Sequence, residues 1–186
     1  MLQLSSAGKR FGAKLLFEDV NWLITPDERT GLVGSTGPGP SPLLTVLAGM
    51  ESLDYGTLTS VKGMTLGYLP QDGLALRGKT VFAECLSVFD HLYALETESL
   101  ALTTTLSEAD PKSAAYAAAA SRYSDIADQL HVHDIYTLDS QVGAVLGGLG
   151  FSKEDWERKT EEFSGGWQMR IALAKLLLQK PSLLLL

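Results

Sequence analysis

The stretch "GLVGSTGPGPSPLLTVLAG", residues 31–49, has the spacing of a phosphate-binding loop, G-x-x-x-x-G-K-[ST], with one substitution that matters. In such a loop, consecutive backbone N–H groups curl around phosphates at the start of a helix. Here the lysine position holds Pro40, whereas Ser41 keeps the hydroxyl that would face a metal ion. The glycines that keep the loop's spacing are Gly34, Gly37 and Gly39.

The prolines of this loop weaken its grip on phosphate. Pro38, Pro40 and Pro42 each lack a backbone N–H, so each removes one donor. Loss of the lysine's charge-assisted contact at Pro40 alone is expected to cost about 1.5–3 kcal/mol, or about one to two decades in affinity. Taken alone, the loop is better explained as a Gly/Pro-rich turn between a strand and a helix. The choice between such a turn and a phosphate loop therefore depends on the neighbouring sequence.

The sequence around the loop predicts an α/β domain. We expect a buried strand over Gly31–Val33, then a short helix that opens near Pro42 and is terminated by Gly49. Residues 1–73 otherwise alternate as short strands joined by turns. The stretches expected as further strands are "LQLSSAG", "LFEDVNWLIT", "GTLTSVKG" and "MTLGYLPQD".

Residues 80–140 form a different zone, which we interpret as an inserted helical hairpin. Apolar residues recur there at helical spacing, and a second stretch, rich in alanine, follows Asp110-Pro111. This zone contains ten acidic residues and two basic ones, Lys112 and Arg122. Its net charge is therefore −8, within a chain of net charge −7. This charge argues against broad electrostatic capture of nucleic acid, and no direct DNA binding is predicted.

The composition is that of a soluble protein of the cytoplasm. No apolar run approaches the roughly 18–20 residues that cross a bilayer, and the N-terminus lacks the continuous apolar stretch of a signal peptide. The single cysteine, Cys85, excludes an internal disulfide and is expected to be a small core residue on an apolar helical face.

The motif "FSGGWQMR", Phe163 to Arg170, opens the last predicted helix. Ser164 is a good N-cap, and Gly165 and Gly166 would let a ligand approach the backbone at the positive end of the helix dipole. The helix is expected to end near Pro181 and to lead into a buried strand, Leu183–Leu186. An ordinary N-capped core helix is the simpler alternative.

Together these motifs resemble the ATP-binding cassette proteins, and more closely their ABC-F subfamily of soluble, ribosome-associated cassettes. Trp167 together with Met169-Arg170 in the signature motif is typical of that group. The order and spacing of four further stretches also resemble it: "LFEDVNWLI", "ERTGLVG", "GYLPQD" and "GLGFSKEDW". The resemblance implies a P-loop NTPase cassette with an N-terminal antiparallel β subdomain, an inserted α-helical arm and a signature subdomain. The implied divisions are residues 1–79, 80–140 and 141–186.

The resemblance also assigns roles to residues. Phe11 would stack on adenine, and Gln71 would be the glutamine that senses Mg²⁺ and the γ-phosphate, with Ser41 as a second magnesium ligand. The nucleotide-binding residues implied are Phe11, Gly34, Thr36, Gly37, Gly39, Pro40, Ser41, Pro42 and Gln71. The signature residues implied to face ATP on a second, partner cassette are Ser164, Gly165, Gly166, Trp167 and Gln168.

The chain departs from the family pattern in two places. The pattern has Asn at Thr36, Lys at Pro40 and Thr at Pro42, and it continues from Leu183–Leu186 into an Asp-Glu pair that orients Mg²⁺ and activates water. Phosphoryl transfer needs those charges. We therefore expect no competent ATPase from this chain alone, and we interpret it as an N-terminal fragment of a longer ABC-F protein, incomplete at the C-terminus; a natural truncation or a decayed copy is the alternative.

Three functions follow as alternatives. The first is an ATP- and Mg²⁺-binding cassette of a ribosome-associated ATPase that acts in translation. The second is the nucleotide-binding subunit of a transporter, which the signature wording and the acidic hairpin disfavour. The third is a non-catalytic cassette remnant that acts only by binding a partner, which the prolines and the missing carboxylates favour.

Overall fold

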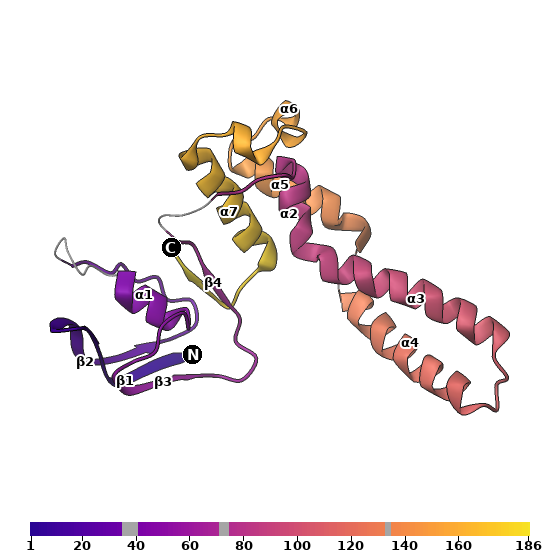
Figure 1. The fold of residues 1–186 in the computed structure, drawn as a ribbon, viewed down its shortest axis with the longest axis horizontal. Coiled ribbons are helices and arrows are strands. Elements are labelled where there is room, and N and C mark those ends of the chain that lie inside the picture. The colour runs from indigo at the N-terminus through magenta and orange to yellow at the C-terminus, as the bar shows by residue number, and fades with distance from the viewer. Residues whose placement is uncertain (35–40, 71–74, 133–134) are drawn as a thin grey trace. The chain divides into compact units, whose positions relative to one another are not determined.

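The computed structural model describes residues 1–34, 41–70, 75–132 and 135–186 (Figure 1). The chain divides into two compact units. We call residues 1–72 with 180–186 the sheet unit, and residues 73–179 the helical unit. The chain passes from one unit to the other at 72–73 and again at 179–180.

The sheet unit is built on three antiparallel strands in the order β2-β1-β3 (Figure 1). Strand β1 (Leu2–Phe11) pairs with β2 (Lys14–Ile24) on one side and β3 (Tyr55–Ser60) on the other. The three strands coincide with stretches in which apolar and polar residues alternate, so the predicted antiparallel β subdomain is confirmed.

A second, parallel ladder joins segments that are far apart in the sequence. Strand β4 (Leu66–Tyr68) pairs in parallel with β5 (Leu183–Leu185). Helix α1 (Ser41–Leu47) is followed two residues later by Gly49, whose φ of +73° is the left-handed conformation that terminates helices. The buried side chains that form the core of the sheet unit are Leu2, Leu4, Ala7, Ile24, Leu47 and Leu185.

The predicted buried strand at Gly31–Val33 is wrong. The structure has no strand there, and the side chain of Val33 is 98% exposed. A buried strand needs hydrogen-bonded neighbours. In the described part of the chain the parallel ladder consists of β4 and β5, and its register does not include residues 31–33.

The helical unit contains the expected insert and the last helix. Its first elements are α2 (Val81–Leu86), a 3₁₀ turn at Ser87–Phe89, α3 (Asp90–Glu108) and α4 (Ala114–Val132). A second group follows: a 3₁₀ turn at Ile135–Thr137, α5 (Leu138–Gly148), α6 (Lys153–Trp156), a 3₁₀ turn at Thr160–Glu162, and α7 (Gly165–Gln179).

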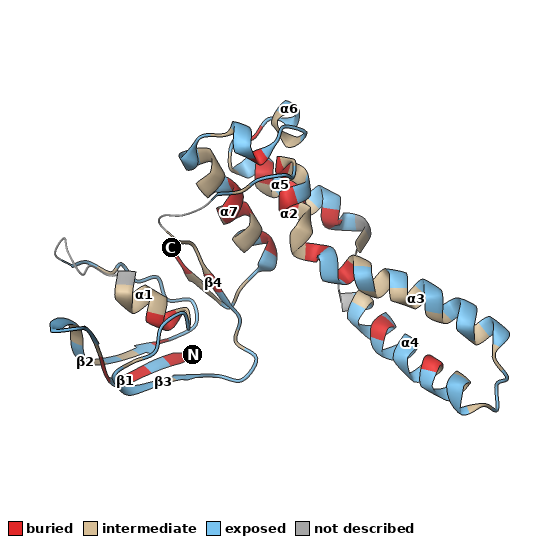
Figure 2. Cartoon of the chain, viewed as in Figure 1, coloured by how far each residue is buried: buried red, intermediate tan, exposed pale blue. Residues whose placement is uncertain are grey.

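Helices α2, α5 and α7 share one apolar core (Figure 2). Val81, Val142, Leu146 and Ile171 are each 0% exposed within it. Cys85 is also fully buried, which confirms its prediction as a core residue, and burial raises the pKa of its thiol to about 12. The thiol is therefore protonated and unreactive at neutral pH.

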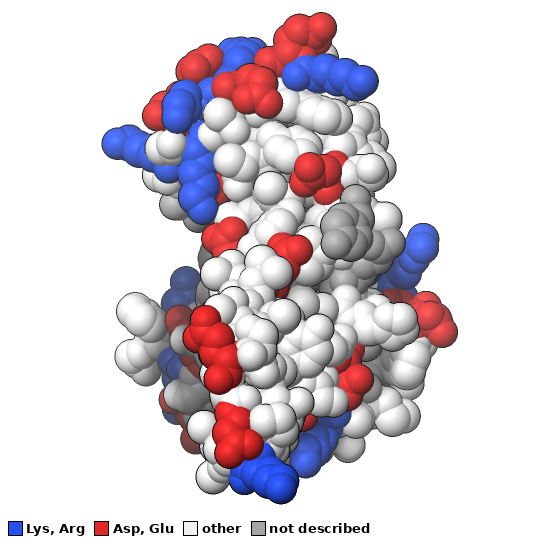
Figure 3. All heavy atoms as spheres, turned by 90° about the vertical axis from the view of Figure 1, so that its right-hand side faces the viewer, with Lys and Arg blue, Asp and Glu red and all other residues white. Residues whose placement is uncertain are grey.

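Helices α3 and α4 form the predicted hairpin. Arg122 of α4 donates to both carboxylate oxygens of Glu98 on α3, at 2.7 Å each, and this pairing lowers the pKa of Glu98. Most of the hairpin is exposed (Figure 2). On the face shown in Figure 3, acidic side chains are scattered among uncharged ones rather than gathered in one patch. Among the described residues, no helix combines the length and the apolar character of a membrane span.

Candidate functional site

Only part of the predicted phosphate loop lies within the described residues. Thr36, Gly37, Gly39 and Pro40 lie outside the described residues, and so does Gln71. Gly34, the first glycine of the loop, is exposed. At the other end of the loop, Ser41 and Pro42 are the first two residues of α1, and the Pro42 carbonyl accepts a 3.0 Å hydrogen bond from the hydroxyl of Thr45.

Phe11 lies at the end of β1, beside the turn that leads into β2, and its side chain is 78% exposed. The strand end beneath it is tied to the segment before β3. Asp54 accepts a 2.6 Å hydrogen bond from the Arg10 N–H, and its own N–H donates to the Gly8 carbonyl at 3.0 Å. A fixed backbone with a free ring is what stacking on a flat ligand requires.

Sequence reasoning missed the anchoring role of Asp54. Its neighbourhood carried a usable signal, since an aspartate ahead of a Tyr-Gly strand start is a residue that caps turns. The partner of that carboxylate, however, lies 44 residues earlier in the chain. No local pattern identifies such a partner.

The signature loop is exposed at its glycines. Ser164 immediately precedes α7, and its carbonyl accepts from the N–H groups of Trp167 and Gln168, each at 2.9 Å. This confirms Ser164 in the N-cap position. A side-chain carbon added to Gly165 or Gly166 would meet no heavy atom within 4 Å. The start of a 15-residue helix is therefore open to a ligand, and its dipole favours an anion.

An aromatic cluster supports the loop from within the helical unit. Trp167 lies edge-on to Phe151, with ring centroids 4.9 Å apart, and Phe163 is edge-on to Phe151 at 5.8 Å. Two arginines cover this cluster. The guanidinium of Arg158 lies 4.3 Å from the ring centroid of Phe163, and that of Arg170 lies 4.4 Å from the ring of Trp167. Each is a cation–π contact.

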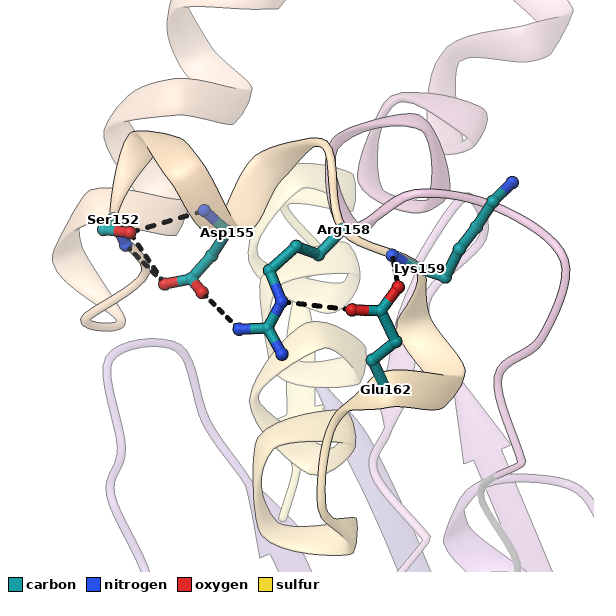
Figure 4. A network of polar contacts seen from close by, with 5 residues as sticks. All are labelled: Ser152, Asp155, Arg158, Lys159 and Glu162. Atoms are coloured by element: carbon teal, nitrogen blue, oxygen red, sulfur yellow. Dashed lines mark hydrogen bonds and ion pairs between the residues drawn. The ribbon is translucent and has the colours of Figure 1, made fainter.

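A polar network fixes the segment that leads into the signature loop (Figure 4). Ser152 caps α6 through a capping box with Asp155. The guanidinium of Arg158 reaches Asp155 at 2.9 Å and Glu162 at 3.2 Å. The backbone N–H of Lys159 donates to the second oxygen of Glu162. Hydrogen bonds from Ser152 and then from Arg158 lower the pKa of Asp155, so the network is intact at neutral pH.

The side chain of Gln168 makes its contacts inside the chain. Its amide nitrogen donates to the carbonyls of Thr160, at 3.2 Å, and Phe163, at 3.3 Å, while its oxygen accepts from the Leu76 N–H at 3.3 Å. Gln168 also lines an open pocket of about 450 Å³, together with Ala75, Arg77 and Glu161.

Comparison with known proteins identifies the class. The family described as ABC transporter matches residues 17–186, so the chain belongs to the family of ATP-binding cassettes. Similar proteins include ABC-F members over the full chain: "ABC transporter F family member 2" of Arabidopsis thaliana is 28% identical over 100% of this chain and 27% of its own length.

Two bacterial relatives have similar coverage. The chain is 32% identical to the "Uncharacterized ABC transporter ATP-binding protein YfmM" of Bacillus subtilis, and covers 36% of that protein. It is 36% identical to the "Tylosin resistance ATP-binding protein TlrC" of Streptomyces fradiae, and covers 34% of it. Each match spans 100% of this chain, which thus corresponds to about a third of the length of these relatives.

Solved structures show the same fold. The ATP-binding subunit of an ABC transporter superposes with a TM-score of 0.64 at 14% identity, over 99% of this chain and 64% of that one. The dimeric structure of MJ0796, a bacterial ABC transporter cassette, gives 0.61 at 16% identity, over 99% of this chain and 72% of that one. The α/β cassette fold is therefore confirmed.

Proposed function

We propose that this chain is the ATP-binding cassette of an ABC-F type, ribosome-associated ATPase that acts in translation. The observation that carries the proposal is the exposed α3–α4 hairpin, inserted between Gln71 and a signature loop whose glycines are open. Two cassettes that close on ATP would move such an arm, so that binding energy is converted into a change in the arm's position. The Arabidopsis ABC-F relative, similar over the full chain, supports this subfamily.

In this proposal the two sides of the cassette have different tasks. On the nucleotide side, Phe11 stacks on adenine, Ser41 and Gln71 hold Mg²⁺, and the loop from Gly34 to Pro42 surrounds the phosphates. On the signature side, Ser164, Gly165 and Gly166 present backbone N–H groups to the nucleotide of a second cassette. Trp167 and Gln168 support this surface without contacting the nucleotide through their side chains, because these side chains contact other residues of the helical unit.

The proposed phosphate loop is degenerate. From this chain, the proposed Mg²⁺ ligands are the hydroxyl of Ser41 and the amide of Gln71. Pro40 supplies neither a charge nor an N–H. We therefore expect weak ATP binding on this side and a signature side that is competent to serve a partner.

Cosedimentation of the full-length protein with purified ribosomes, with and without ATP, tests the proposal. We expect ATP-dependent recovery in the ribosome pellet. Recovery with membranes instead would favour a transporter subunit, and recovery with neither would leave no support for a role in translation. Binding of a fluorescent ATP analogue, measured in parallel, reports on the nucleotide site separately.

One observation favours a second candidate, a cassette that binds its partner without nucleotide. The three prolines of the loop remove donors that phosphate needs. For this candidate, ribosome or partner binding would be unchanged by ATP, and the fluorescent analogue would not bind even at millimolar concentration.

A further inference from the structure

We propose that Gln168 is a positioning residue that fastens the segment after Gln71 to the signature loop. The proposal rests on the proposed function, since it assigns a task to a residue of the signature motif. Its side-chain amide joins three backbone groups: the N–H of Leu76 and the carbonyls of Thr160 and Phe163. Leu76 is five residues beyond Gln71, and Phe163 directly precedes Ser164.

The chemistry of a carboxamide explains why glutamine suits this position. It has two N–H donors and one carbonyl acceptor. Here the donors point to two carbonyls at 3.2 and 3.3 Å, and the acceptor receives one N–H at 3.3 Å. A carboxylate could not donate, and an ammonium could not accept. Both the signature loop and the segment at Leu76 therefore depend on the same side chain.

Further bonds hold the same two segments together, which makes the contact a seam rather than a single hydrogen bond. The N–H of Gly78 donates to the Glu161 carboxylate at 3.0 Å, and its carbonyl accepts from the Lys159 ammonium at 3.2 Å. The backbones also pair, since Thr160 N–H donates to the Lys79 carbonyl at 3.1 Å. Gln168 is the member of this seam that also touches the carbonyl next to Ser164.

The place of this seam in the chain gives it a function. One of the two chain passages between the sheet unit and the helical unit is at residues 72–73, and Leu76 is among the first described residues after it. A displacement of Leu76 would be passed through Gln168 to Phe163, and with it to the loop of Ser164 to Gly166.

The test is amide hydrogen exchange on the full-length protein, with Gln168→Met as the variant. Methionine keeps the length of the side chain but removes all three hydrogen bonds. Gln129→Met is the matched control, because Gln129 is exposed and, within the described part of the chain, its side chain donates to the Asp125 carbonyl of its own helix, α4. We expect exchange at Leu76 and at Trp167 to accelerate together, by about tenfold, in Gln168→Met alone.

Core amides distinguish positioning from general stability. If Gln168 only contributes stability, exchange at Leu146 and Ile171 accelerates as much as exchange at Leu76, and the proposal is wrong. Unchanged exchange at Leu76 overturns it as well. None of these readings needs ATP or a ribosome, so the proposal can fail while the proposed function stands.

A second readout connects positioning with activity. The full-length wild-type protein and both variants are added to an intact partner cassette, and its ATP turnover is measured. We expect Gln168→Met to lower the stimulated kcat at least fivefold with KM unchanged, and Gln129→Met to leave both constants as in the wild type. A stimulated kcat retained in Gln168→Met overturns the positioning role, whereas absence of stimulation by the wild type itself counts against the proposed function.

Discussion

Two glycine-rich loops each lead into a helix in this chain, and they differ in their residues and in the side chains that surround the start of the helix. The stretch from Gly34 to Pro42 contains three prolines and no lysine, and its last two residues open α1, a helix of 7 residues. Helix α7, of 15 residues, begins with two open glycines. Its first turns also contribute to an aromatic cluster with two arginines and carry a glutamine bound to three backbone groups. The first stretch lacks the lysine and several N–H groups of the phosphate-loop pattern, while the second leaves the start of a long helix open.

The helices that follow the two loops, α1 and α7, belong to different cores. Leu47 at the end of α1 is buried with β1 and β5, whereas Ile171 of α7 is buried with α2 and α5. Of the residues that the structure describes, none belongs to both of these clusters of buried side chains. We therefore expect a substitution at the start of α1 to leave the packing around α7 unchanged.

The largest expected effect comes from Ile171→Ala. This side chain is fully buried on α7, and its truncation should lower the free energy of unfolding of the helical unit by about 2–5 kcal/mol. Leu177→Ala on the same helix, at a residue that is 41% exposed, is the control and should cost much less. Urea denaturation followed by hydrogen exchange checks both. Amides of β1 and β3 should keep their protection; their loss would contradict the independence of the two loops.

Repair of the phosphate loop should have the next largest effect. Pro40→Lys with Pro42→Thr restores the lysine charge and two backbone N–H groups, which should increase ATP affinity at least tenfold, about 1.4 kcal/mol or more. Calorimetric titration of the full-length protein with MgATP measures this. Pro26→Thr, in a turn of the sheet unit remote in sequence, is the matched control. No gain in affinity would show that the loop is not a phosphate site.

The cap of α6 tests the support of the signature loop. Ser152→Ala removes the side-chain acceptor of the capping box and should cost about 1 kcal/mol. Ser121→Ala, at an exposed position inside α4, should stay within about 0.5 kcal/mol of the wild type. Thermal unfolding compares the two. An equal loss in both variants would mean that the network of Figure 4 adds nothing specific to this loop.

The smallest expected effect is the pH dependence of the hairpin. The hydrogen bonds from Arg122 lower the pKa of Glu98 from its ordinary value of 4.5, so their contribution is present above pH 4.5 and is lost as pH falls through the lowered folded pKa. Arg122→Met should unfold at a slightly lower temperature at pH 7, and this gap should close below pH 4.5. Lys112→Met is the control. A gap that stays constant with pH would exclude this ion pair as its cause.

Much of the fold was predictable because its elements have local signals. Alternating residues identified β1 and β2, alanine content identified α4, and Gly49 marked the end of α1. The strand expected at Gly31–Val33 was wrong for the opposite reason. An apolar run indicates only that a strand is possible. Whether it pairs with other strands by hydrogen bonds depends on segments elsewhere in the chain.

The candidate site was predictable to a smaller degree. The signature motif gave Ser164 its N-cap position, and that position is confirmed. The roles assigned to Phe11, Gln71 and the phosphate loop remain predictions. The contacts of Asp54 with Arg10, and of Gln168 with Leu76, join residues 44 and 92 positions apart. Such pairings leave no period or spacing in the sequence.

The sequence by itself determined the family, the order of most elements and the absence of a lysine from the stretch Gly34 to Pro42, because motif spacing, periodicity and residue identity are local properties of the chain. The tertiary structure alone decided which backbone groups Gln168 joins, that Val33 is exposed, and that α1 and α7 pack in separate cores. Those features depend on hydrogen bonds and packing between distant segments, which form only when the whole domain folds.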